Sequence, residues 1–116
     1  MNERLPHISE LLKQKKKKRN KYNARKTWVD GFCFDSAKEA KYYQSLQLRG
    51  RAGLIDRFHR QVMFDLPGGI VYKCDFQVFN RDGSVEYIDV KGKRTKEYIM
   101  KSKQVKALYG IDIKEV

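Results

Sequence analysis

The sequence predicts one domain of mixed α/β class, built on a single central β-sheet that helices flank. The chain has 116 residues, which is the size of one domain. Short segments of alternating apolar and polar residues are typical of strands, and two longer segments carry the start and stop signals of helices. Their order is helix, three strands, helix and strand, which indicates an α-β-β-β-α-β core.

The first two elements of the body are expected to be a hairpin and a helix. Residues 26–34 (KTWVDGFCF) predict a small hairpin, because Asp30-Gly31 is a turn pair. Residues 35–53 predict a helix with Ser36 or Asp35 as its cap. Two glycines within the last four positions of that segment are expected to end the helix.

Three strands are expected next, at residues 54–66, 70–80 and 85–91. Pro67-Gly68-Gly69 separates the first two strands, and Asp82-Gly83 lies between the second and the third. Even-numbered residues form the more apolar face of the first two strands. The members of this face are Phe58, Val62, Phe64, Leu66, Tyr72, Cys74, Phe76 and Val78.

A second helix and a last strand complete the core. Residues 95–110 predict the helix, and Gly110 is expected to stop it. Residues 111–116 predict the final strand, and a short helix capped by Ser9 is expected at residues 7–12. The residues of the second helix expected to face inward are Tyr98, Val105 and either Leu108 or Tyr109.

Positive charge is concentrated at the N-terminus. Ten of the 26 Lys and Arg residues but only two of the 14 Asp and Glu residues lie in residues 1–27, so this segment carries +8 of the net charge of +12. The expected partner is a polyanion, of which nucleic acid is the commonest. We expect residues 1–21 to be a basic, flexible arm and residues 22–116 to be the folded domain. The alternative is a solvated arm with no specific target.

The composition argues against membrane and secreted classes. No apolar run approaches the ~20 residues that a membrane helix needs, and the N-terminus has no apolar stretch of a secretory signal. Cys33 and Cys74 fit reduced, buried thiols better than a disulfide framework or a zinc site, which needs more ligands. We therefore expect a cytoplasmic location and no membrane partner.

Two aspartates stand in these strands where a core would favour apolar residues. A two-residue turn at Asp82-Gly83 would place Asp75 opposite Val90, on the wrong face. A three-residue loop of residues 81–83 would place Asp75 opposite Asp89 instead. That loop needs a left-handed residue at its third position, and a glycine is there. The glycine therefore permits the register that brings the two carboxylates together.

Paired carboxylates indicate a metal site. Two such groups side by side repel each other unless a cation lies between them. Oxygen ligands favour a hard ion, so Mg²⁺ is expected, and Mn²⁺ can replace it. Lys91 follows Asp89 by two residues and shares its face, where it would orient a water, help to deprotonate it or stabilise charge on a phosphate. Together these groups predict phosphodiester hydrolysis.

The ordered motifs resemble those of the PD-(D/E)XK nucleases. Asp75 followed by Asp89-Val90-Lys91 has the form of that site, without the proline of its first motif. The patterns "KY…DG..FDS.KEA..Y", "L…Q..F.L", "Y..DF", "DVKG..T..Y..K.K" and "YGI.I.EV" are similar to those of a small phage and prophage group related to Holliday-junction resolvases. The resemblance covers about residues 21–116. It implies a restriction-endonuclease-like fold and Mg²⁺-dependent cleavage of DNA, branched DNA in particular.

The resemblance also implies roles for individual residues. Asp75 and Asp89 would be metal ligands, supported by Glu39 and the Val90 carbonyl, and Lys91 would position the nucleophile. The residues expected to contact DNA are Lys15, Lys16, Lys17, Lys18, Arg19, Gln61, Lys93, Lys101 and Lys103. A four-way junction is two-fold symmetric and needs paired cuts, so one site per chain implies a homodimer.

Several of these residues have a purely structural alternative. Ser36 and Glu39 have the spacing of a capping box, in which the glutamate caps the helix. The two aspartates could form salt bridges across the sheet instead. Glu86 is expected at the sheet surface, away from the site, and His59 is expected to be a polar strand residue.

Two other functions compete with the DNA nuclease. A non-catalytic basic nucleic-acid-binding protein needs only the charge, although paired aspartates would weaken its hold on phosphates. A nuclease that acts on RNA is compatible with every feature above.

Overall fold

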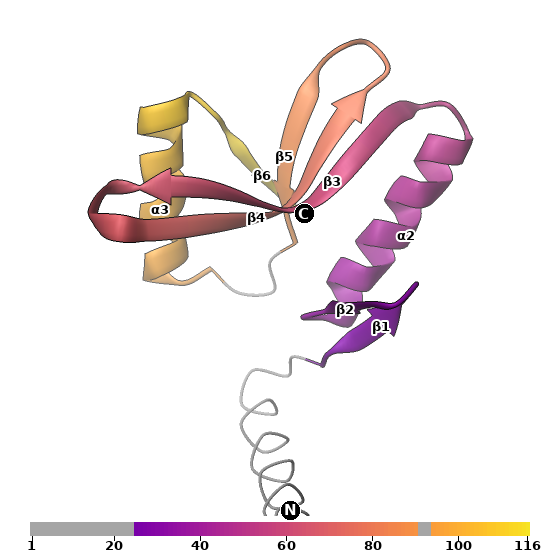
Figure 1. The fold of residues 1–116 in the computed structure, drawn as a ribbon, viewed down its shortest axis with the longest axis horizontal. Coiled ribbons are helices and arrows are strands. Elements are labelled where there is room, and N and C mark those ends of the chain that lie inside the picture. The colour runs from indigo at the N-terminus through magenta and orange to yellow at the C-terminus, as the bar shows by residue number, and fades with distance from the viewer. Residues whose placement is uncertain (1–24, 91–93) are drawn as a thin grey trace, which may run out of the picture. The chain divides into compact units, whose positions relative to one another are not determined.

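The computed structural model describes residues 25–90 and 94–116 (Figure 1). The predicted helix at residues 7–12, the whole of the basic arm (residues 1–21), Lys91 and Lys93 lie outside the described residues. The chain divides into two compact units, Met1–Lys41 and Tyr42–Val116. Helix α2 crosses the boundary between them, and each unit is described by itself below.

The first unit contains a two-stranded hairpin. Strand β1 (Thr27–Val29) pairs antiparallel with β2 (Phe32–Phe34). The turn residues Asp30 and Gly31 have φ angles of 53° and 80°, the left-handed pair that a tight hairpin turn needs. This confirms the predicted hairpin and its turn.

Helix α2 (Ala37–Arg51) begins at the predicted cap. Ser36 Oγ accepts a hydrogen bond from the Glu39 N–H at 3.1 Å, which satisfies one of the donors left over at a helix start. At the other end, Gly53 adopts a φ of 77° and its N–H bonds to the Gly50 carbonyl. Both predicted ends of the helix are therefore confirmed.

The second unit is built on a four-stranded sheet. The strands are β3 (Ile55–Leu66), β4 (Ile70–Asn80), β5 (Val85–Asp89) and β6 (Ile113–Glu115). They lie side by side in the order β3-β4-β5-β6; the first two pairings are antiparallel and the last is parallel. This is a mixed central sheet with helices, as the sequence predicts.

Helix α3 (Lys96–Tyr109) connects β5 to β6. Thr95 Oγ1 accepts the Tyr98 N–H at its start, and Gly110 ends it in the left-handed conformation. Tyr98 and Val105 are buried as predicted. At its end, Leu108 and Tyr109 are both exposed, although the ring of Tyr109 lies 5.3 Å from that of Phe64.

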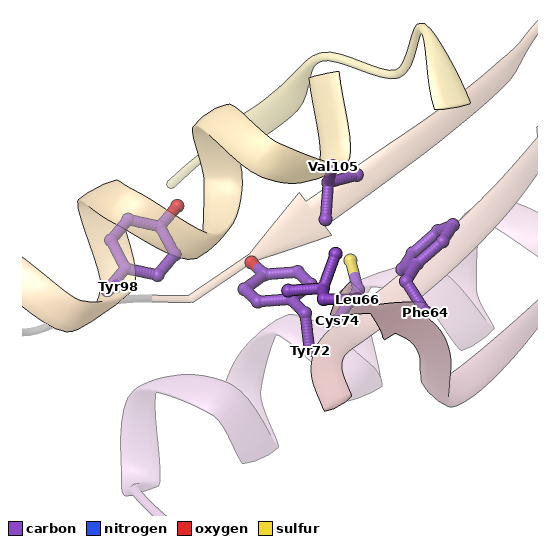
Figure 2. Packing of buried hydrophobic residues seen from close by; sticks show 6 residues of the cluster. All are labelled: Phe64, Leu66, Tyr72, Cys74, Tyr98 and Val105. Carbon is purple, nitrogen blue, oxygen red and sulfur yellow. The ribbon is translucent and has the colours of Figure 1, made fainter. Parts of the chain in front are cut away.

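The apolar, even-numbered residues of β3 and β4 are divided between the two helices. Near one end, Phe76 and Phe58 lie against the rings of Tyr42 and Tyr43 from α2, at 5.5 and 5.7 Å. Near the other end, even-numbered residues pack against α3, where the ring of Tyr72 is 6.2 Å from that of Tyr98, and against Tyr87 of β5, which lies opposite the odd-numbered Gln77. The second half is a compact cluster of Phe64, Leu66, Tyr72, Cys74, Tyr98 and Val105 (Figure 2). The sequence predicts these apolar residues as one face of two regular strands, but not their division between two helices.

Gln61 lies at the position in β3 where the packing of the apolar residues changes from α2 to α3. It has the unusual φ angle of 54°. A side chain on Cβ disfavours this left-handed region, so a glutamine there is uncommon. The paired positions of β3 and β4 run through Arg60 and Phe76 and continue at Val62 and Cys74, on either side of this residue.

Both cysteines lie in the described part of the chain. Cys74 is buried and Cys33 is half-buried, and neither of these two described cysteines is in a disulfide. Among the helices of the described residues, none is long and apolar enough to cross a membrane.

Candidate active site

The loop between β4 and β5 sets the register of the two strands. It has three residues, because Asn80 and Ser84 bond to each other across it, and Gly83 takes a φ of 92°. Phe76 lies opposite Ile88 in the resulting ladder. One position further, the same register sets Asp75 opposite Asp89. The register predicted from the glycine is thus confirmed.

The two aspartates are joined by reciprocal hydrogen bonds. The Asp75 N–H donates to Asp89 Oδ1 at 2.8 Å, and the Val90 N–H donates to Asp75 Oδ2 at 2.9 Å. Each carboxylate therefore reaches across to the opposite strand and accepts a backbone N–H there. Such hydrogen bonds fix the orientation of a carboxylate, as is usual for metal-ligating carboxylates.

Burial and mutual repulsion both make the ionised forms of these two carboxyl groups unfavourable. Asp89 has an exposed fraction of 0%, and Asp75 is half-buried. Removing a carboxylate from water costs free energy unless it is compensated, and a like charge beside it adds to the cost. A divalent cation would offset both costs.

Glu115 lies beside Asp89, and the hydroxyl of Tyr98 lies within the influence of both carboxyl groups. In the parallel pairing of β5 with β6, Glu115 lies beside Asp89, and the Val116 N–H donates to the Asp89 carbonyl at 3.0 Å. Burial raises the pKa of the Tyr98 hydroxyl, and the charges of Asp89 and then Glu115 raise it further. Arg94 offsets part of this charge, with its Nε 3.2 Å from Glu115 Oε2.

Glu115 is a residue that sequence reasoning missed. Its position beside Asp89 follows from the parallel pairing of two strands that α3 separates in the chain, and no local turn fixes such a register. The motif YGI.I.EV contains this glutamate, which is the only signal in the sequence.

The acidic donors at this position are few. Within residues 25–90 and 94–116, no group of three or more His, Cys, Asp or Glu side chains is placed to hold a metal. Mg²⁺ binds through one or two carboxylates and keeps waters or phosphates as its other ligands. Asp75 and Asp89 supply two carboxylates of this kind.

The other predicted residues of the site are distributed differently. Glu39 lies in the first unit, in the first turn of α2, with an exposed fraction of 3%. Val90 is buried and follows Asp89 directly, with its N–H bonded to Asp75. Lys91 lies outside the described residues, so its role stays a prediction.

The predicted DNA contacts are only partly described. Lys15, Lys16, Lys17, Lys18, Arg19 and Lys93 lie outside the described residues. Lys101 forms an ion pair with Glu97 at 3.1 Å, one helical turn away, and Lys103 is exposed on the same helix. Gln61 occupies the position of β3 across from Asp75.

Glu86 lies on the opposite face of β5 from Asp89, as predicted. Asn80 Nδ2 donates to Glu86 Oε1 at 3.1 Å, and Lys114 Nζ lies 3.4 Å from Oε2. The hydrogen bond from Asn80 holds the pKa of this carboxyl below its usual value, and the charge of Lys114 also lowers it. Glu86 is therefore a paired surface residue.

A patch of cationic and aromatic side chains lies on the odd-numbered face of β3 and β4. The Arg57 guanidinium lies over the ring of Phe79, 4.2 Å from its centroid. His59 contacts the same ring edge-on at 5.5 Å. Arg57 and His59 are exposed. His59 is thus a polar strand residue, as predicted, and Arg57 is an exposed cation that sequence reasoning did not select.

Comparison with known proteins identifies a family but no activity. None of the curated proteins compared with the chain matches it. A family model described as a protein of unknown function, DUF1064, matches residues 19–115, from the end of the basic run to the strand that carries Glu115. Since this match spans the whole of both described segments except the last residue, the chain belongs to the DUF1064 family.

Proposed function

We propose that this protein is a Mg²⁺-dependent DNA endonuclease of the PD-(D/E)XK type. The observation that supports this most is the reciprocal pairing of Asp75 and Asp89, which brings two oriented carboxylates together in a buried position. The sequence follows this pair with a lysine, which is the order of the nuclease motif.

In this proposal Asp75 and Asp89 would hold the ion with the Val90 carbonyl, and the supporting role of Glu39 rests on the sequence resemblance alone. Bound Mg²⁺ would supply charge stabilisation for phosphodiester hydrolysis. Asp75 and Asp89 orient their oxygens through the backbone N–H groups that they accept. Lys91 would hold a positive charge beside the reacting phosphate and position the nucleophile.

A structural role for the aspartates is the alternative to a metal site. Their carboxylates accept N–H groups at the end of the β4–β5 ladder, which would stabilise the sheet without any ion. Asp75→Asn separates the two roles, because the amide oxygen still accepts the Val90 N–H while the charge is lost. We expect Mg²⁺ to raise the melting temperature of the wild type and not of this variant. At a free Mg²⁺ concentration of one hundred times its Kd, binding of the ion would raise the free energy of unfolding of the wild type by about 2.7 kcal/mol.

DNA is the proposed substrate, and branched DNA is favoured by the sequence resemblance. The net charge of +12 favours a polyanion. Arg57, on the odd-numbered face of β3, adds an exposed cation beside Phe79. We further propose that the protein acts as a homodimer in the cytoplasm, which would be that of the host cell if a phage encodes the chain.

One experiment tests the proposed activity. Purified protein is incubated with plasmid, single-stranded, Y-shaped and four-way DNA, and with RNA of matched length, each with and without Mg²⁺. We expect cleavage of DNA only with Mg²⁺, and paired symmetric cuts in the four-way junction. Tight binding with no cleavage of any substrate would favour the non-catalytic nucleic-acid-binding protein. Cleavage of RNA alone would replace the DNA nuclease with an RNA nuclease.

A further inference from the structure

The left-handed backbone of Gln61 lies directly across β4 from the candidate site. Paired positions of β3 and β4 share one register on both sides of it, from Phe58 with Val78 to Leu66 with Ile70. In that register Gln61 stands opposite Asp75. Its φ of 54° is the only left-handed conformation of a residue other than glycine within the strands of residues 25–90 and 94–116.

In a regular ladder, the N–H and C=O groups of successive residues of β4 point alternately to β5 and to β3. Asn80 N–H donates to the Ser84 carbonyl, so even-numbered residues of β4 direct their backbone groups to β5. Odd-numbered residues of β4 therefore direct theirs to β3. In an unbroken ladder the Asp75 N–H would face the backbone of Gln61.

The observed hydrogen bond runs in the other direction. The Asp75 N–H donates to Asp89 Oδ1, a side-chain atom of β5, at 2.8 Å. A left-handed residue turns its peptide groups away from the ladder direction, as in strand irregularities that re-aim neighbouring side chains. The irregularity at Gln61 and the redirected N–H of Asp75 therefore occur at the same step of the sheet.

We propose that Gln61 is a positioning residue, whose left-handed backbone redirects the Asp75 N–H to the Asp89 carboxylate and so brings the two aspartates into their paired arrangement. Backbone strain of this kind is found at functional sites, where the surrounding structure maintains it. The catalytic consequence rests on the proposed function, whereas the backbone consequence does not.

The test compares two substitutions that both remove the glutamine side chain. Gln61→Gly adopts a positive φ without strain, and Gln61→Val strongly disfavours it because valine is β-branched. Any difference between the two variants therefore reports the backbone and not a lost side-chain contact. If Gln61→Val does not fold, Gln61→Ala replaces it, because alanine disfavours positive φ less.

Amide resonances of Asp75 and Val90 in ¹⁵N spectra give the structural readout. We expect both to stay close to the wild-type positions in Gln61→Gly and to shift in Gln61→Val or Gln61→Ala. We also expect Gln61→Gly to raise the melting temperature, because it relieves strain. As the matched control, Met63→Gly on the same strand should lower the melting temperature, since Met63 is in regular register with Lys73.

Cleavage of DNA gives the functional readout. Gln61→Gly should cleave at least ~10-fold faster than Gln61→Val, since a misplacement of about 1 Å can cost ~10²-fold in rate. Equal amide shifts in the two variants, or equal cleavage rates with wild-type-like melting, would overturn the proposal. If the wild type cleaves no DNA, the proposed function fails, and the amide comparison alone confirms or overturns the role of Gln61.

Discussion

Single residues of β5 show how its two faces differ. Glu86 accepts a hydrogen bond from Asn80 and lies close to Lys114 on one face, so its charge is matched at the surface. Asp89, on the other face, is buried beside the carboxyl groups of Asp75 and Glu115, of which Glu115 is paired with Arg94. A cation would find its most favourable position on the second face.

Glu86 makes a prediction about stability at acid pH. Its pKa lies below the usual 4.5 in the folded protein, because of the Asn80 hydrogen bond and the charge of Lys114. The contribution of Glu86 to stability is therefore present above the unfolded-state pKa and is lost as the pH falls through the folded-state value. We expect Glu86→Gln to lower the melting temperature slightly at pH 7 and to equal the wild type at pH 3. A gap that widens toward low pH would contradict this sign.

At the scale of elements, the loop between β4 and β5 determines the candidate site. Deleting Ser84 would keep the three-residue loop of residues 81–83 but set Asn80 opposite Val85, which shifts the register by one and sets Asp75 opposite Val90. We expect this deletion to abolish cleavage. Gly83→Ala changes the same loop without changing its length, and its Cβ would meet no neighbouring atom. That control should lose about 1–2 kcal/mol of stability, because alanine disfavours the left-handed region, yet keep measurable cleavage.

The hydrogen bond that caps the start of α3 leads to a separate prediction about stability. Thr95 Oγ1 accepts the Tyr98 N–H at 3.0 Å, at the start of the helix that covers Tyr72. Thr95→Ala should therefore cost about 1 kcal/mol in the free energy of unfolding, measured by denaturant titration. Thr95→Ser keeps the hydroxyl and should cost much less. Equal losses in both variants would show that the threonine methyl group, and not the hydrogen bond, stabilises the helix start.

The elements that could be predicted from the sequence are those that local residues specify. Asp30-Gly31, Ser36 and Gly110 mark a turn, a helix start and a helix end, and Gly83 permits the three-residue loop. Glu115 could not be placed beside Asp89, because the parallel pairing depends on the packing of α3. The conformation of Gln61 gave no signal either, since the left-handed region favours glycine or asparagine.

At the scale of the whole molecule, the charge distribution suggests two tasks for two parts of the chain. The segment of residues 1–27 carries +8 of the net charge, while the candidate active site lies in the second unit. Affinity for DNA and cleavage of DNA should therefore respond to different changes.

Deletion of residues 1–20 tests the role of the basic arm. We expect weaker binding to every DNA, with the salt dependence reduced by about one unit for each lost phosphate contact. The melting temperature should not change, because the segment is mainly basic and has few apolar residues to pack. Unchanged affinity with a lower melting temperature would show that the segment stabilises the fold instead.

The central claim is that Asp75 and Asp89 are a metal-binding pair, and the Mg²⁺-dependent cleavage rate of Asp89→Asn measures it most directly. The amide oxygen can still accept the Asp75 N–H, so the strand pairing is kept while one carboxylate charge is removed. With Glu86→Gln as the control on the opposite face of β5, we expect Asp89→Asn to lose at least ~10²-fold in cleavage rate and to bind DNA as well as the wild type. Glu86→Gln should cleave at nearly the wild-type rate. Full activity in Asp89→Asn, or equal losses in the two variants, would contradict the account.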